Sequence, residues 1–200
     1  ELVKPMRIAL LSDEYLPSGI RIHSKMIHEL AINFKERGHE TIVITPGDPY
    51  QQSHLIIDFI DEIEIWRFKS GHTRGVGFFR RAMNEWLLSY RAWIAIKQHQ
   101  KNSEFDLCVN YSPTIFFGPL AGRLKSKGSY VYLVLRDMFP QWIIDLEILD
   151  KRNPIYFIFK YYEKVLYANS SKIGIQSQNN SKYFNSHNYK KKIEFLSNWY

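Results

Sequence analysis

Residues 6–19 read Met-Arg-Ile-Ala-Leu-Leu-Ser-Asp-Glu-Tyr-Leu-Pro-Ser-Gly, and they open a unit that extends to residue 45. The apolar run at 8–11 is typical of a strand that is buried on both faces of a parallel sheet. Apolar residues then recur at helical spacing as far as Phe34, and Gly38 is placed to cap this helix in the left-handed conformation. A second apolar run follows at 42–44. The pattern predicts a βαβ unit with a right-handed crossover.

Further apolar stretches predict the remaining strands. Helical patterns at 74–101, 114–127 and 153–168 separate them, and the strands are expected within 56–68 and at 106–109, 131–135 and 172–175. This alternation predicts an α/β fold with one Rossmann-like, doubly wound and mainly parallel sheet. Residues 1–200 are enough for a single domain of this kind, and no internal repeat or low-complexity linker divides them.

The loop after the first strand lies where such a sheet binds ligands, at the carboxyl end of a strand and beside the N-terminus of a helix. Gly19 would let the backbone approach a phosphate closely, while Arg21, His23 and Lys25 bring positive or polar side chains to the same end. The dinucleotide fingerprint needs three glycines at fixed spacing, and this loop has one. A nicotinamide site is therefore not expected.

Charge and cysteine content limit the possible partners. The formal charge of +7 favours phospholipid, nucleic acid or a phosphate-bearing substrate. The single cysteine, Cys108, lies in an apolar run, so we expect a reducing compartment and no disulfide framework. No stretch is long enough to span a bilayer, and no signal peptide is expected. Metal-ligand spacing, a P-loop and a Gly-x-Ser-x-Gly motif are all missing from the sequence.

Residues 74–101 combine an apolar helical face with six basic residues and one acid, Glu85. Such a segment is either a core helix with a solvated face or a surface helix on an anionic membrane. We favour the core helix for its C-terminal part. At its start, two adjacent phenylalanines beside two arginines are hard to place in one core. This favours contact with a membrane or a lipid acceptor through Phe78, Phe79, Arg80 and Arg81.

Two motifs together resemble a known family. The opening residues 7–19, the box Glu36-Arg-Gly-His-Glu-Thr-Ile-Val-Ile-Thr-Pro and the order between them resemble the N-terminal half of family 4 GT-B glycosyltransferases. Ser18-Gly19 replaces the usual double glycine of that family. Further along, the strand at 131–135 runs into Arg136-Asp137-Met-Phe-Pro, which is similar to the branch that builds O-antigens and capsules. Alternatively, Arg136 and Asp137 only pair with each other or cap the next turn.

The resemblance implies a bacterial enzyme of cell-surface polysaccharide synthesis. It would transfer a sugar from a UDP- or GDP-sugar to a lipid-linked or glycan acceptor, with retention and without a metal or another cofactor. In that family a C-terminal domain holds the donor through two glutamates separated by seven residues, and no such pair occurs in residues 1–200. We therefore expect this chain to be the acceptor-side half, inactive alone, in a cytoplasmic enzyme bound peripherally to the inner face of the membrane.

The resemblance also implies roles for the residues at the carboxyl edge of the sheet. The loop Ser18-Gly19-Ile20 would face the donor phosphates or the acceptor. The residues that would line the cleft are Arg21, His23, Arg136 and Asp137. Asp137 would accept the proton of the attacking hydroxyl. His23 would bind the acceptor, or alternatively only cap the helix that follows it.

Two rival functions remain open at this point. The first is a non-catalytic basic α/β module that binds nucleic acid or phospholipid, and charge alone supports it, because no RNP strand, helix-turn-helix or zinc spacing is present. The second is a phosphorylase or epimerase that shares the GT-B fold, which the two acceptor-side motifs disfavour.

Overall fold

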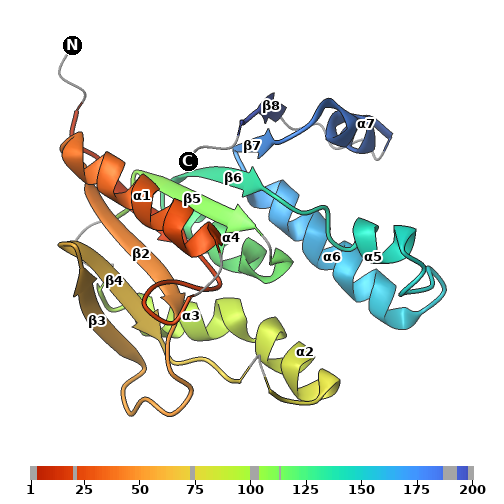
Figure 1. Ribbon diagram of the computed structural model, residues 1–200, viewed down its shortest axis with the longest axis horizontal. Coiled ribbons are helices and arrows are strands. Elements are labelled where there is room, and N and C mark those ends of the chain that lie inside the picture. Colours follow the sequence, from red (N-terminus) through yellow and green to blue (C-terminus); the bar gives the residue numbers. More distant parts are fainter. Residues whose placement is uncertain are drawn as a thin grey trace.

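The computed structural model describes residues 4–19, 22–72, 75–99, 104–112, 114–186 and 193–197. Within them, eight strands form one sheet in the order β3-β4-β2-β1-β5-β6-β7-β8 (Figure 1), and every neighbouring pair is parallel except β3 with β4. The strands are β1 (Arg7–Leu11), β2 (Glu40–Pro46), β3 (Leu55–Ile60), β4 (Ile63–Phe68), β5 (Leu107–Ser112), β6 (Tyr130–Leu135), β7 (Lys172–Ile175) and β8 (Ile193–Phe195).

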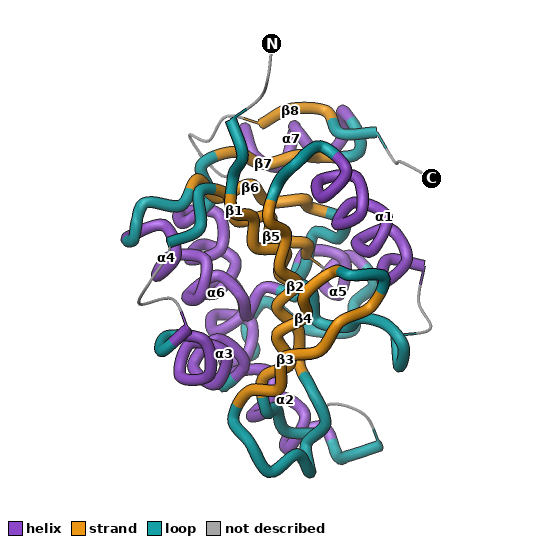
Figure 2. Tube along the Cα trace, turned by 90° about the vertical axis from the view of Figure 1, so that its left-hand side faces the viewer, coloured by secondary structure: helices purple, strands orange, loops and turns teal. Residues whose placement is uncertain are grey.

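Helices connect these strands and cover both faces of the sheet. The described helices are α1 (Ile22–Glu36), α2 (Phe78–Trp86), α3 (Leu88–Ile96), the 3-10 turn η2 (Ile115–Phe117), α4 (Gly118–Ser126), α5 (Gln141–Asp145), α6 (Pro154–Asn169) and α7 (Gln178–Ser186). Figure 2 shows α3, α4 and α6 on one face and α1 on the other. The predicted Rossmann-like, mainly parallel α/β fold is confirmed, and all five predicted buried runs are parallel strands.

Side chains of the central strands alternate between two apolar cores, because successive residues of a strand point to opposite faces. Ile8 and Leu10 belong to the core on the α1 side, together with Ile27 of that helix. Ala9 and Leu11 belong to the core on the other face, which α3, α4 and α6 complete. Each fully buried aliphatic side chain stabilises the fold by about 1.5–3 kcal/mol. This double burial explains why the strands read as unbroken apolar runs.

Helix ends follow the signals in the sequence. Gly38 has a φ of 83° after α1, as predicted for a left-handed cap, and the N–H of His39 donates to the Phe34 carbonyl at 3.0 Å. At the start of α6, Asn153 Oδ1 accepts a hydrogen bond from the N–H of Ile155 at 2.9 Å, and Pro154 occupies the first turn.

Three local predictions differ from the structure. Residues 56–68 form two antiparallel strands rather than one, because Asp61 and Glu62 both have positive φ and make a tight two-residue turn. The helical segment expected at 74–101 is interrupted at Leu87, where α2 ends and α3 begins. The short strand β8 was not expected, and it pairs with β7 at the edge of the sheet.

The packing of α4 on α6 depends on a close approach at Gly118. A Cβ at this position would lie 2.8 Å from the backbone nitrogen of Leu166 and 2.9 Å from its Cα. We expect Gly118→Ala to lower the free energy of unfolding by roughly 1–3 kcal/mol, since backbone atoms cannot rotate away from the added methyl group.

A matched control for this change is Gly77→Ala, where a Cβ would meet nothing within 4 Å. The control should change the stability by only a few tenths of a kcal/mol, because alanine can adopt the φ of −61° at Gly77 and the lower entropy of the unfolded chain offsets the weaker N-cap. Urea unfolding of both variants makes the comparison. Equal stability of the two variants would contradict the close approach of α4 to α6.

Candidate functional site

The loops after β1, β5 and β6 lie at one edge of the sheet. In the sheet order, β1 lies between β2 and β5. The strands that follow β1 in sequence are added first on the β2 side and then, from β5 onward, on the other side. This is the topological switch point, outside which open α/β sheets bind ligands. After the carboxyl ends of β4 and β6 the chain continues into α2 and α5, which flank this edge (Figure 1).

Three adjoining cavities follow this edge. The central cavity, about 240 Å³, is lined among others by Asp13, Asp137 and Trp142. The loop cavity, about 330 Å³, shares Asp13, Arg81 and Glu85 with it. The amide cavity, about 670 Å³, shares Asp137 and Trp142 with the central cavity. The carboxamides that give the amide cavity its name are those of Gln141, Asn179 and Asn180.

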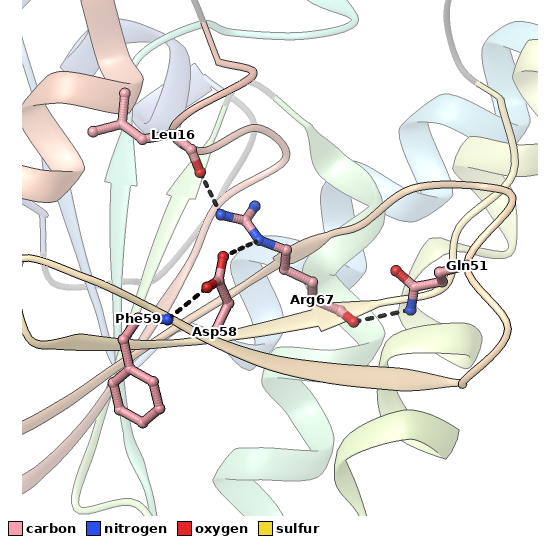
Figure 3. Close-up of polar contacts among 5 residues, drawn as sticks. All are labelled: Leu16, Gln51, Asp58, Phe59 and Arg67. Atoms are coloured by element: carbon pink, nitrogen blue, oxygen red, sulfur yellow. Dashed lines mark hydrogen bonds and ion pairs between the residues drawn. The ribbon is translucent and has the colours of Figure 1, made fainter.

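Arg67 on β4 holds the loop after β1 against the sheet (Figure 3). Its Nη2 donates to the carbonyl oxygen of Leu16, and its Nε donates to Asp58 Oδ2 at 3.2 Å. The other carboxylate oxygen of Asp58 accepts a hydrogen bond from the N–H of Phe59 at 2.8 Å, and the Arg67 carbonyl accepts one from Gln51 Nε2 at 3.1 Å. A hydrogen bond from a charged donor contributes about 1.5–3 kcal/mol, which is more than a neutral one contributes.

A second anchor joins the same loop to α1. The hydroxyl group of Tyr15 lies 2.7 Å from His28 Nδ1, and His28 Nε2 lies 2.9 Å from Asp61 Oδ2 in the β3–β4 turn. Burial raises the pKa of Tyr15 above its ordinary value; the charge of Arg67 opposes this rise and that of Asp61 adds to it. The neutral phenol therefore persists over the whole physiological pH range and keeps the loop fixed.

The predicted loop residues occupy different surroundings. Ser18 lines the loop cavity. Gly19 is buried, its N–H donates to the Tyr15 carbonyl at 2.9 Å, and a Cβ there would lie 2.8 Å from that carbonyl oxygen. Gly19 is thus required by the turn itself. Ile20 and Arg21 lie outside the described residues.

Tyr111, at the carboxyl end of β5, joins two residues that the sequence predicted. The ring of His23 stacks on the Tyr111 ring with centroids 5.7 Å apart, and the guanidinium carbon of Arg136 lies 5.9 Å from the same ring centroid. His23 Nε2 also lies 3.5 Å from Asp13 Oδ1. His23 is only 8% exposed and does not line the three cavities, so it contacts the cleft through Asp13.

Three described carboxylates line the central cavity, and one of them, Glu85 of α2, is paired with Arg81. Asp13 comes from the loop after β1 and Asp137 from the loop after β6. Burial raises the pKa of the Tyr111 phenol, Arg136 lowers it, and the charges of Asp137 and Asp13 raise it further, so all three charged groups act on this ring. The arrangement offers two possible proton acceptors beside a neutral phenol.

The sequence reasoning missed Asp13 and Tyr111 as members of this site. Both lie at or just after the end of a buried strand, the signal that identified Arg136 and Asp137. Asp13 could have been found by this rule. Tyr111 could not be distinguished from a core aromatic residue, because only its contacts with His23 and Arg136 show its place.

Comparisons with known proteins identify the fold. No family model matches the chain, and a search of curated proteins found no match. Among solved structures, sucrose-phosphate synthase from Thermosynechococcus elongatus matches with a TM-score of 0.70 at 11% identity, over 96% of this chain and 48% of that chain. This chain therefore has the Rossmann-like fold found in one domain of GT-B glycosyltransferase structures.

Two further solved structures agree with this. The catalytic domain of starch synthase IV from Arabidopsis thaliana, bound to ADP and acarbose, has a TM-score of 0.65 at 13% identity, over 97% of this chain and 52% of that chain. A UDP-forming α,α-trehalose-phosphate synthase from Burkholderia xenovorans, in complex with glucose-6-phosphate, has a TM-score of 0.61 at 11% identity. The match covers 89% of this chain and 42% of that chain. The chain spans about half the length of these structures. At such identities the likeness is one of fold.

The described residues include neither a membrane-spanning helix nor a cluster of metal ligands. No helix among them is long and apolar enough to cross a membrane. They also contain no group of three or more His, Cys, Asp or Glu side chains that could hold a metal ion.

The Arg67 anchor is testable by Arg67→Met, which keeps an aliphatic stem but removes the guanidinium. We expect the free energy of unfolding to fall by roughly 1.5–3 kcal/mol, because the partners of the guanidinium lose a charged donor. Hydrogen exchange at the Gly19 N–H, which closes the loop, should become faster. Arg37→Met, at an exposed position after α1, is the control and should change neither quantity. If both variants behave alike, Arg67 does not hold the loop.

Proposed function

We propose that this chain is the acceptor-binding, N-terminal half of a retaining glycosyltransferase of bacterial cell-surface polysaccharide synthesis. The complete enzyme transfers a sugar from a UDP- or GDP-sugar to a hydroxyl group of a lipid-linked or glycan acceptor. The observation that carries the proposal is the cleft at the switch point of a fold shared with sugar-transferring synthases.

The donor, in this proposal, is held mainly by a second, C-terminal domain. The chain spans about half the length of the synthases that it matches, and one of these is bound to ADP while another is described as UDP-forming. The two halves would enclose the reacting atoms, with Ser18 in the loop cavity facing the acceptor. Helix N-termini and basic side chains would meet the phosphate charge without a metal ion.

Asp137 is the proposed proton acceptor for the attacking hydroxyl group of the acceptor. It lines both the central and the amide cavities, so an acceptor that spans them would pass its carboxylate. Asp13, positioned by His23, would hold a second acceptor hydroxyl, and Arg136 would provide a positive charge beside Asp137. The amide cavity would accommodate the remaining hydroxyl groups of the acceptor through its carboxamides.

The roles of the two carboxylates are testable in the complete enzyme. Asp137→Asn should lower kcat by about 10²–10⁴-fold, the usual contribution of a positioned general base. Asp13→Asn and His23→Ala should mainly raise the KM for the acceptor. Steady-state kinetics with varied acceptor concentration separates these effects. A near-normal kcat for Asp137→Asn, or a larger loss of kcat for Asp13→Asn, would refute the assignment of Asp137 as the base.

The 200-residue chain by itself should not transfer sugar, because in this proposal the transition state forms between two domains. We expect no nucleoside diphosphate release above the buffer rate when the purified chain is incubated with UDP- or GDP-sugars and a membrane lipid extract. Turnover by the isolated chain that Asp137→Asn abolishes would contradict the two-domain account.

We also propose that the enzyme acts at the inner face of the cell membrane, bound peripherally through the start of α2. Arg80 is exposed there, and Met83 and Trp86 expose apolar surface on the same helix. The side chains of Phe78 and Phe79 lie outside the described residues. Arg81 lines the loop and central cavities and its Nε lies 2.9 Å from Glu85 Oε1, so this arginine also belongs to the cleft.

Changing Phe78 and Phe79 to Ser and Arg80 and Arg81 to Glu should release the chain from anionic liposomes. Each basic residue near such a surface contributes about 1 kcal/mol, and salt screens this attraction. Lys125→Glu with Lys127→Glu on and after α4 changes charge elsewhere and serves as the control. Cosedimentation of the four-residue variant at the level of the parent would exclude this segment as the contact.

The comparisons do not favour the alternative of a non-catalytic basic module, since the matched structures are synthases. Binding of labelled DNA or RNA at moderate salt, without a response to lipid or sugar, would favour the binding module over the transferase.

A further inference from the structure

A fourth cavity, here called the basic cavity, lies beside the cleft. It has a volume of about 620 Å³, is open to solvent and is lined by the β2–β3 loop, the segment after β4, and helices α2 and α3. It shares Ser70, Gly71 and His72 with the loop cavity, so this short segment separates the two. The sequence shows no sign of a cavity at this place, and Arg80, which was expected to contact a membrane, lines it.

The charge of the basic cavity is of one sign. Lys69, Arg80 and Arg91 line it, and none of its described lining residues is acidic. Within the described part of the chain, no ion pair joins any of these three cations to a carboxylate. The loop and central cavities differ, because each contains acidic side chains. An anion would therefore meet attraction in the basic cavity and repulsion next to it.

Arg91 shows that the cavity is prepared for a negative ligand. It is partly buried, and burial lowers the pKa of its guanidinium although the group stays charged at any physiological pH. Its Nη1 donates to the neutral Asn84 Oδ1 at 3.0 Å. Removing a cation from water without an opposite charge is unfavourable, and a bound anion would offset this cost.

The walls of the cavity are held in place before any ligand binds. Asn84 Nδ2 donates to the His72 carbonyl at 2.8 Å, so the same side chain fixes both Arg91 and the separating segment. The N–H of Lys69 donates to the His54 carbonyl at 2.8 Å and extends the β3–β4 pairing to the cavity. A fixed site loses little conformational entropy on binding, which favours affinity.

Apolar surface lies next to the cations. Tyr50 is 76% exposed, and its ring contacts the His72 ring edge-on with centroids 4.9 Å apart. Tyr90 and Ile94 line the cavity from α3, and Tyr90 is 56% exposed. A small inorganic anion would leave these faces in water. A phosphate joined to a hydrocarbon group would use both the charge and the apolar surface.

We propose that the basic cavity binds the phosphate group of a ligand that carries an apolar hydrocarbon tail. The phosphate is held by Lys69, Arg80 and Arg91, and the tail lies along Tyr50, Tyr90 and Ile94. The identification of this ligand as the acceptor of the transferase rests on the proposed function. In that case the sugar-bearing end reaches the cleft past Ser70–His72, while the phosphate remains outside the acidic centre.

The test uses the 200-residue chain and geranyl phosphate, a soluble ten-carbon prenyl phosphate, in calorimetric titration at low ionic strength. Geraniol tests the tail without phosphate, and inorganic phosphate tests the anion without a tail.

The double variant Lys69→Gln, Arg91→Gln should bind geranyl phosphate at least tenfold more weakly than the parent. Lys69→Gln alone leaves the Arg91–Asn84 contact intact and should weaken binding by a smaller factor. The control, Lys125→Gln with Lys127→Gln, removes two charges outside the cavity and should bind as the parent does.

Three results would overturn the proposal. They are the absence of geranyl phosphate binding, equal binding by the parent and the double variant, and inorganic phosphate binding as tightly as geranyl phosphate. Vesicles that contain phosphatidic acid show whether the ligand is a lipid headgroup or a soluble phosphate. If it is a headgroup, the parent binds these vesicles and the Lys69→Gln, Arg91→Gln variant binds them more weakly; if it is soluble, the two bind the vesicles equally. The titration involves no sugar transfer, so an inactive complete enzyme would refute the proposed function and leave this result intact.

Discussion

The hydrogen bond from Arg67 to the Leu16 carbonyl determines where the loop after β1 lies, and the cleft is built on that loop. Arg67 is itself oriented by Asp58, so a hairpin at the edge of the sheet fixes a loop at its centre. The Tyr15–His28–Asp61 chain joins the same hairpin to the same loop through α1. Asp13 and Ser18 take their places in the cavities because both ends of this turn are held.

Charge is separated along the carboxyl edge of the sheet. The central cavity contains Asp13 and Asp137 besides the Arg81–Glu85 ion pair, whereas the basic cavity is lined by three cations and no described acid. The segment Ser70–His72 lies between the basic cavity and the loop cavity. An acidic reaction centre with a separate anion site beside it suits a substrate whose reacting hydroxyl and whose phosphate are distant from one another.

The sequence was sufficient for the fold, because strands buried on both faces are unbroken apolar runs and capping residues mark helix ends. For the candidate site it named Asp137, which lines the central cavity, from its position after a buried strand. It failed at the β3–β4 turn, since Asp61 and Glu62 are not typical of a two-residue turn with positive φ. The contacts that hold this turn, with His28 and Lys35, come from a helix more than 25 residues away. Tyr111 and the basic cavity were missed for the same reason: their residues meet only in the folded chain.

The central claim is that this cleft serves sugar transfer to an acceptor. Its most direct test is incorporation of label from radioactive UDP- and GDP-sugars by the complete protein in the presence of a membrane extract of its host. The account predicts a labelled product that needs both the protein and the extract and that extracts into organic solvent or precipitates with polysaccharide. No labelled product with any nucleotide sugar, from a folded protein that binds DNA or RNA at moderate salt, would contradict it.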